Sequence, residues 1–409
     1  MQYHYYRAAN VYNIIRVFVS SYVWMTGFGN FLYFDKKQDF SVERGISMWL
    51  RINYFPLLLS VFVGVPFDLL YIVPLHTTAF FITMITCYVA KLFETYLHMN
   101  HWQKNCTAMS LCLFVHVIFY ETPCVKLLKY FFGHEIYFRF TSDKYSAILG
   151  IVSGYFWHHA QSFVTWANTP ISLSAAQLPN HTSILPTSEA TSESNRSNDT
   201  VDMGNKNGTV SVQFTKEQWI AKCGQVVVGV ALILLWWMLF GHINDKLVYN
   251  PIHPLIFWLP LFGWLMIRNS SKYLTEVHST ALEFFGKITL ETYVLQFHVF
   301  MCQNVQHIPI VLPNAGPKGN AIMKFLNMLL TGVGFIALAY WARKITVTTQ
   351  TTVTDLVVLL LDRGTTGNHT NSNVEISSVT EKVSLTGTST AGEAENNAIG
   401  ISENGDHQK

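Results

Sequence analysis

The sequence predicts an all-α fold, a polytopic transmembrane helix bundle of about nine to ten spans. The chain has 409 residues, of which 50% are hydrophobic, 14% aromatic and 13% charged, and that charged share is about half the average for soluble domains. Apolar runs recur along the chain, and most reach the roughly 20 residues needed to cross a bilayer core of about 30 Å. Aromatic rings such as Tyr33 and Trp341 stand near their ends, as rings at headgroup level do.

The apolar runs divide the chain into two membrane halves. The candidate spans are 14–34, 54–64, 69–90, 106–120, 145–167, 219–241, 248–267, 284–302 and 321–341, with a short, weak tenth run at 353–361. The segments 169–218 and 362–409 are rich in Ser, Thr, Asn and Gly, so they cannot bury enough apolar surface to fold alone. We therefore expect membrane helices over 1–168 and 219–361, a disordered polar loop between them, and a disordered tail.

The orientation of these spans stays open. The polar loop carries four N-x-S/T sequons, which are typical of a glycosylated lumenal segment; they are Asn180, Asn195, Asn198 and Asn207. In contrast, the loop between the first two spans carries basic residues, which favour a cytosolic position there; they are Lys36, Lys37, Arg44 and Arg51. Counting spans from that point places the polar loop in the cytosol as well. One of the two signals is therefore misleading, or an additional crossing lies within 125–140.

Composition also excludes some function classes. The formal net charge is +2, and no basic run with interleaved aromatics is present, so no nucleic-acid partner is expected. The six cysteines are scattered without a C-x-x-C pair or zinc-ligand spacing, and no metal is predicted.

Ionisable side chains within an apolar run are candidates for function, because such groups are costly in lipid unless they are paired or face a watery cavity. The densest set lies in LEFFGKITLETYVLQFHVF, where Glu283, Lys287, Glu291 and His298 fall along one stripe of a predicted single helix, bordered by Gln296. His298 is the candidate general base, with Glu291 and Lys287 as its catalytic partners. The alternative is an ion-paired stripe that packs one helix against its neighbours.

Two further sets are candidates for binding a substrate or cofactor. In FFGHEIYFRFTSDKYSAILG, the charged residues Glu135, Arg139, Asp143 and Lys144 precede a long apolar run. Arg139 and Lys144 fit a phosphate-rich ligand such as coenzyme A, although snorkelling to lipid headgroups explains them equally well.

The other set opens the chain. Arg7, Asn10, Asn13 and Arg16 recur at three-residue steps on one helical face, although a solvated helix end would show the same pattern. Asn30 follows Gly27 and Gly29, which indicate close helix packing or a break in the span.

Three of these segments carry a resemblance to a known family. IRVFVSSYVWMTGFGNF, LEFFGKITLETYVLQFH and SDKYSAILG resemble the membrane domain of the sialate O-acetyltransferases and the fungal capsule O-acetylation proteins, and the match covers about 3–343. The resemblance implies a ten-transmembrane acyltransferase domain that takes acetyl from acetyl-CoA toward a sialic acid-like carbohydrate hydroxyl in the Golgi membrane. The expected partners are a sialylated acceptor and membrane lipid.

The resemblance also exposes a departure and leaves two rival functions. In that family a lumenal domain of the SGNH hydrolase type brings a G-D-S nucleophile and a D-x-x-H pair, and the sequence contains neither motif. The chain is thus expected to represent the membrane half, and its activity alone stays open. A transporter of acetyl-CoA or another anion, or a non-catalytic partner of a full-length family member, remains an alternative. No internal repeat is visible, which favours the enzyme over the transporter.

Overall fold

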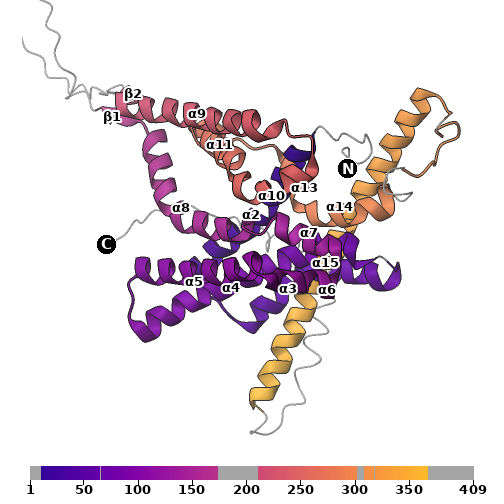
Figure 1. Cartoon of the computed structure of the whole chain (residues 1–409), viewed down its shortest axis with the longest axis horizontal. Helices are drawn as coiled ribbons and strands as arrows, with labels where there is room; N and C mark the ends of the chain where they lie inside the picture. The colour runs from indigo at the N-terminus through magenta and orange to yellow at the C-terminus, as the bar shows by residue number, and fades with distance from the viewer. Residues whose placement is uncertain (1–10, 65, 174–210, 302–307, 317, 367–409) are drawn as a thin grey trace, which may run out of the picture. The chain divides into compact units, whose positions relative to one another are not determined.

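The computed structural model describes residues 11–64, 66–173, 211–301, 308–316 and 318–366 (Figure 1). By contacts the chain forms two compact units, Met1–Thr351 and Thr352–Lys409, and all residues discussed below as part of a site lie in the first. Nearly every described element is helical, so the all-α expectation is confirmed.

The first half contains five long helices, α2 (Tyr12–Lys37), α3 (Val42–Phe62), α4 (Ile72–Leu97), α5 (His101–Glu121) and α8 (Ser146–Asn168). Short helices lie between them, namely η2 (Phe67–Leu70), η3 (Pro123–Val125), α6 (Lys126–Phe132) and α7 (His134–Ser142). The helix α3 begins well before the predicted run at 54–64, because Ser41 caps it by accepting a hydrogen bond from the Arg44 amide at 3.2 Å. Arg44 and Arg51 therefore lie within this helix, not in a loop as the charge count assumed.

The polar loop is bounded by a small antiparallel ribbon. Strand β1 (Ile171–Leu173) pairs with β2 (Ser211–Gln213), with Ser172 opposite Val212. The expected disordered loop over 169–218 thus has paired ends, while 174–210 lies outside the described residues. The second half then continues through α9 (Lys216–Trp236), the π-helical turn η5 (Trp237–Gly241), α10 (Lys246–Ile256) and α11 (Trp258–Arg268).

The predicted span at 284–302 is divided into short pieces. These are α12 (Lys272–Glu276), α13 (Thr280–Lys287), α14 (Thr289–Leu295) and the π-helical turn η6 (Gln296–Phe300). Ile288 interrupts the helix, so the single stripe predicted across it is not formed. The runs at 321–341 and 353–361, predicted as separate spans, belong to one continuous helix, α15 (Ala321–Thr366).

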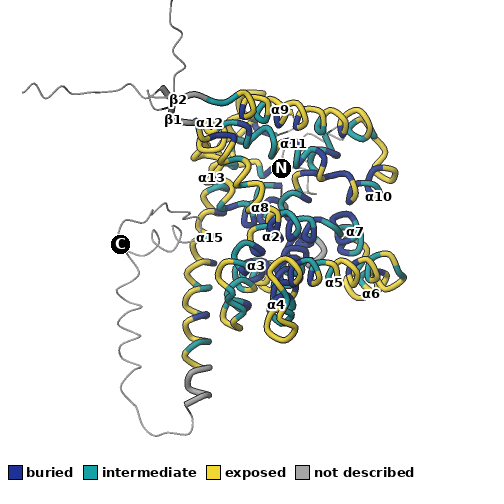
Figure 2. Tube along the Cα trace, turned by 90° about the vertical axis from the view of Figure 1, so that its left-hand side faces the viewer, coloured by how far each residue is buried: buried dark blue, intermediate teal, exposed yellow. Residues whose placement is uncertain are grey.

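Glycines set the closest helix packing in the first unit. A Cβ atom added at Gly27 would collide with the carbonyl oxygen of Ala147, and one at Gly150 would collide with that of Trp24. The helices α2 and α8 approach this closely because neither glycine has a side chain at the contact, as in small-residue interfaces of membrane helices. Buried residues concentrate along α2, α4 and α8, whereas α9 is largely exposed (Figure 2).

The exposed side chains are those of a membrane protein. Among the described helices, 4 are long and apolar enough to cross a bilayer, or up to 6 if each of two bent helix pairs counts as one span. Large apolar side chains stay exposed on them, including Val227 at 66% on α9 and Met238 at 70% on η5, which suits contact with lipid. The multi-pass expectation is confirmed, while the described helices that pass this test are fewer than the nine to ten spans predicted.

Candidate functional site

A polar cavity of about 230 Å³ lies where α2, α3, α4, α13, α14 and α15 meet. Three cationic side chains line it, Arg51 from α3, Lys287 from α13 and Arg343 from α15, and none of its lining residues is acidic. His76 of α4 supplies a titratable group to the same wall. Such a cavity between helices suits an anionic ligand.

His76 is buried and held in one orientation. Its side chain is 4% exposed, its Nδ1 lies 2.6 Å from the Thr26 hydroxyl, and the Tyr22 ring packs over it with centroids 4.2 Å apart. The Thr26 hydroxyl also lies 3.4 Å from the Tyr22 carbonyl. Both contacts are satisfied together when Nδ1–H donates to Thr26 and Thr26 donates to Tyr22.

This tautomer leaves Nε2 of His76 as an acceptor. Nε2 is buried and has no hydrogen-bond partner among the described residues. A buried nitrogen without a partner is costly, and here it belongs to a residue of a cavity wall. His76 can therefore accept a proton from a bound ligand.

The long-range pair of Arg51 and Glu291 stands beside the cavity. Nη1 of Arg51 donates to Oε1 of Glu291 at 2.6 Å, and the Glu291 side chain is 1% exposed. Its second oxygen, Oε2, has no hydrogen-bond partner in the described part of the chain. The carboxylate thus fixes the guanidinium at the cavity while keeping one acceptor position unused.

The other two cations, Lys287 and Arg343, meet at the helix break after α13. Arg343 donates to the backbone carbonyl of Lys287, and Lys287 lies 3.1 Å from Oε1 of Glu283. Glu283 also contacts His278 at 3.2 Å. Glu283 is half exposed, and the hydrogen bond from Lys287 lowers its pKa. Glu283 therefore pairs at the outer side of Lys287, while Glu291 pairs with Arg51 instead of with Lys287.

A second polar cluster is fully buried and links α2, α10 and the turn between α7 and α8. Nη2 of Arg16 lies 3.0 Å from Oδ2 of Asp143, and the Ser20 hydroxyl contacts both Oδ1 of Asp143 and, at 2.7 Å, Nε2 of His253. Nδ1 of His253 lies 3.0 Å from the Tyr249 hydroxyl. Ser20 and His253 are both 0% exposed.

The arrangement of hydrogen-bond donors in this cluster argues against Ser20 as a nucleophile. Its single hydroxyl proton is best placed on the ionised Asp143, because hydrogen bonds to charged acceptors are the stronger ones. Nε2 of His253 then donates to Ser20, and Nδ1 accepts from the Tyr249 hydroxyl, which lies closer to Nδ1, at 3.0 Å, than to the Asn13 carbonyl, at 3.4 Å. A serine nucleophile needs a base that takes its proton, so this cluster ties helices together, and the cationic cavity is the better functional candidate.

Four other predicted residues have these places in the structure. Asn30 lines the cavity and donates to the Thr26 carbonyl at 2.8 Å. Gln296 is buried at 5% exposure. His298 lies in the η6 turn, half-buried, and its Nε2 has no hydrogen-bond partner among the described residues, but it does not line the cavity. Arg16, a predicted binding residue, is instead part of the buried cluster.

The charged residues before α8 are engaged within the fold. Arg139 lies 2.7 Å from Glu135 and 4.3 Å from the centroid of the Tyr71 ring, and Lys144 pairs with Glu121. Asp143 contacts Arg16, as described above. These groups are held by protein partners, so the structure does not present them as an open phosphate site.

Some predictions fall outside the described residues. They concern Arg7, Asn10, Asn180, Asn195, Asn198 and Asn207. Within the described part of the chain, no group of three or more His, Cys, Asp or Glu side chains is arranged to hold a metal ion.

Sequence reasoning missed His76, Arg51 and Arg343 at the cavity, and Ser20 and His253 in the buried cluster. A signal was present for His76, because it is an isolated ionisable residue within the apolar run VPLHTTAFFITMITC. Arg51 and Arg343 gave no local signal, since their partners are 240 and 56 residues away in the chain.

Comparisons with known proteins agree with this architecture. Residues 2–359 match the model of a family described as the 10 TM acyl transferase domain found in Cas1p. The chain is also 24% identical over 363 residues to the N-acetylneuraminate (7)9-O-acetyltransferase of Danio rerio, covering 82% of this chain and 38% of that relative. It therefore spans well under half of the relative's length. No solved structure matches. Because the family model covers nearly the whole membrane region, the chain belongs to the family of the 10 TM acyl transferase domain found in Cas1p.

Proposed function

We propose that this chain is the membrane domain of a carbohydrate O-acetyltransferase, which transfers acetyl from acetyl-CoA toward a sialic acid-like hydroxyl in the Golgi membrane. The observation that carries the proposal is the cavity where His76, Arg51, Lys287 and Arg343 meet. Membership of an acyltransferase family and likeness to a protein named as an N-acetylneuraminate O-acetyltransferase support the same reaction class.

The cavity fits the reactive end of acetyl-CoA better than the whole molecule. At about 230 Å³, it lies below the usual 300–1,000 Å³ range of drug-sized sites, so the nucleotide would remain outside. With the nucleotide outside, the three cations can reach its phosphates only at the mouth of the cavity, and they also match the carboxylate of a sialic acid. Arg51 presents a guanidinium already oriented by Glu291, which lowers the entropic cost of gripping an anion.

The residues of the cavity can support acyl transfer by general acid–base chemistry. Acetyl-CoA supplies an activated thioester. As the acceptor hydroxyl oxygen bonds to the acetyl carbon, Nε2 of His76 takes the hydroxyl proton. The carbon–sulfur bond breaks, and His76 returns the proton to the departing thiolate. Lys287 and Arg343 stand where they can stabilise the negative charge that develops on oxygen, and Glu291 acts as a positioning residue through Arg51.

The Golgi location and the carbohydrate acceptor are supported by the sequence. The four sequons of the polar loop suit a lumenal segment, because N-glycans are added in the secretory pathway. A sialylated acceptor would be met in the same compartment.

The full chain in proteoliposomes, given labelled acetyl-CoA and a sialylated acceptor, tests the role of His76. We expect His76→Gln to lower transfer by about a hundredfold or more, as loss of a general base does. His298→Gln, at the histidine first nominated from the sequence, is the matched control and should retain transfer. The reverse pattern would move the base to His298.

Binding of coenzyme A to the purified chain separates donor recognition from the complete reaction. Arg51→Gln should weaken binding about tenfold or more, because a charge-assisted hydrogen bond contributes roughly 1.5–3 kcal/mol. Retained binding without transfer would indicate that the acceptor step needs another domain. Label that accumulates inside vesicles without acceptor acetylation would support the transporter, and absence of binding would refute the donor site.

A further inference from the structure

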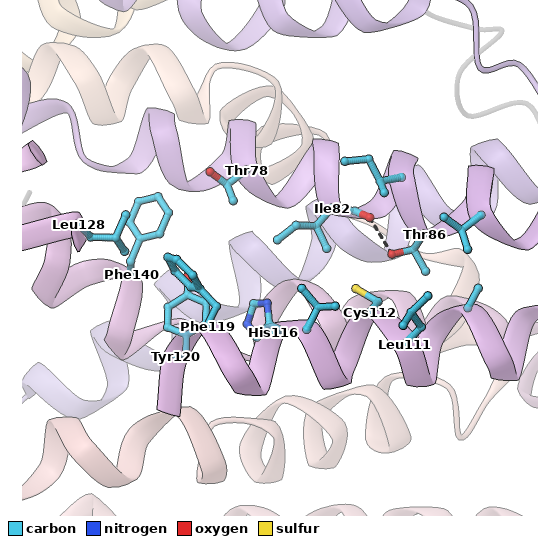
Figure 3. Close-up of a pocket in the computed structure, with 14 residues that line it drawn as sticks. Thr78, Ile82, Thr86, Leu111, Cys112, His116, Phe119, Tyr120, Leu128 and Phe140 are labelled. Carbon is cyan, nitrogen blue, oxygen red and sulfur yellow. Dashed lines mark hydrogen bonds between the residues drawn. The ribbon is translucent and has the colours of Figure 1, made fainter. Parts of the chain in front are cut away.

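A second, apolar cavity of about 470 Å³ runs between α4 and α5 (Figure 3). Ile82 and Val89 of α4 face Leu111 and Val115 of α5 across it, and Leu128 and Phe140 line it from α6 and α7. None of its lining residues belongs to the cationic cavity. We call it the α4–α5 groove.

Two polar groups of the groove wall are used within the protein. The Thr86 hydroxyl donates to the Ile82 carbonyl at 2.7 Å, and Nε2 of His116 contacts the Lys144 carbonyl. Apart from Thr78, Cys112 and Tyr120, the remaining wall is hydrocarbon and aromatic. A hydrocarbon ligand is therefore favoured over a sugar or a nucleotide, because a polar ligand would lose its hydrogen bonds to water there without replacement.

The groove faces a membrane environment. The helix α4 is apolar enough to span a bilayer, and α5 with α6 passes the same test as a bent pair. Phe114 on α5 is 63% exposed beside the groove. From Thr78 to Val89 the α4 wall rises about 16 Å, which is close to one leaflet of a hydrocarbon core about 30 Å thick.

One end of the groove carries positive charge. The helix α6, which contributes Leu128, is bent by 71° from α5 and exposes the aromatic rings of Tyr130 and Phe131 at 84% and 68%. Lys126 and Lys129 of the same helix are exposed and form no ion pair with any described residue. Aromatic and basic residues together are typical of a helix at the headgroup level.

We propose that the α4–α5 groove binds one acyl chain of an anionic membrane phospholipid, with the phosphate of its headgroup against Lys126 and Lys129. The apolar wall suits the acyl chain, and the length of that wall matches one leaflet. The two lysines provide the complementary charge at the end where a headgroup would lie. This lipid site is independent of the acyl-transfer proposal.

Photo-crosslinking in nanodiscs tests whether the acyl chain of the lipid lies in the groove. The probe is phosphatidylglycerol with a diazirine on one acyl chain, and the labelled peptides are identified by mass spectrometry. We expect labelling within 78–89 and 111–120, lowered at least severalfold by Val115→Trp, which fills the groove. Val117→Trp is the control, since Val117 lies on the same helix but does not line the groove. If Val115→Trp fails to fold by its melting temperature, Ile85→Trp, at an exposed lining position, replaces it.

The headgroup is tested with a second pair of variants. Lys126→Gln with Lys129→Gln should reduce labelling by the phosphatidylglycerol probe about thirtyfold, given roughly 1 kcal/mol per lysine at an anionic surface. Labelling by a diacylglycerol probe, which lacks phosphate, should be unchanged. Lys36→Gln with Lys37→Gln removes the same charge elsewhere and should have no effect on either probe.

Three results would overturn the proposal. Labelling of the groove no stronger than that of the exposed α9 face would show only general contact with lipid. Equal loss in the Val115→Trp and Val117→Trp variants would exclude a site in the groove. Efficient dimer formation by a short bis-maleimide at Cys112, which lines the groove, would place a second copy of the chain there instead of a lipid.

Discussion

The buried pair of Arg16 and Asp143 shows how strongly a charge inside this bundle depends on its partner. The two side chains are 2% and 0% exposed, and Nε and Nη1 of Arg16 have no hydrogen-bond partner among the described residues. A charge so far from water depends strongly on its counter-ion, since removal of one partner leaves an uncompensated buried charge.

We therefore predict strong non-additivity at this pair. Arg16→Met and Asp143→Asn should each lower the free energy of unfolding by about 3–5 kcal/mol, whereas the double variant should be less destabilised than the sum, because no isolated charge remains. Melting temperatures in detergent provide the measurement. Lys272→Met, in the exposed Lys272–Glu276 pair, is the control and should cost less than about 1 kcal/mol. Additive losses would contradict the view that the two charges mainly compensate each other.

At the scale of helices, the α2–α8 contact depends on the absence of side-chain atoms. A Cβ at Gly150 would meet backbone atoms of α2, including the Phe28 nitrogen at 2.8 Å, and backbone atoms cannot turn aside. A Cβ added at Gly29, in contrast, would meet nothing within 4 Å. Of these two glycines, Gly150 cannot carry a side chain without a steric clash, whereas Gly29 can.

Substitution by alanine should consequently change the free energy of unfolding in opposite directions at the two positions. Gly150→Ala should destabilise the protein by about 1–3 kcal/mol through overpacking, and Gly29→Ala should stabilise it by about 0.4–1 kcal/mol by restricting the unfolded chain. Thermal unfolding of both variants in one detergent decides the matter. A neutral Gly150→Ala would mean that α8 can move away from α2 at little cost.

For the whole molecule, composition and apolar runs were enough to predict an all-α membrane fold, but not the positions at which its helices are interrupted. In LEFFGKITLETYVLQFHVF, Gly286 and Thr289 weaken the helix near Ile288, but such residues also occur inside unbroken helices, so the surrounding packing decides where the break lies. Lys287 and Asn30 line the cavity, and Glu291 stands beside it. Arg51, the partner of Glu291, was assigned to a loop, since a pair separated by 240 residues leaves no periodic trace in the sequence.

The orientation of the molecule in the membrane gives a prediction at this largest scale. Glycosidase treatment of the full chain expressed in cells should increase its gel mobility if the polar loop is lumenal, because glycans are attached at N-x-S/T sites on that side. Replacing Asn180, Asn195, Asn198 and Asn207 together by Gln should abolish the shift. An unchanged mobility of the parent chain would place the loop in the cytosol, as the basic residues Lys36 and Lys37 suggest.

The β1–β2 ribbon also makes a convenient attachment point. Its ladder holds Leu173 opposite Ser211, so the chain departs and returns at adjacent positions whatever the length of the insert. Doubling a flexible insert adds only about 0.6 kcal/mol of closure entropy. A rigid fiducial domain with neighbouring termini can accordingly replace 174–210, which would give this small membrane protein a visible marker for particle alignment in electron cryo-microscopy.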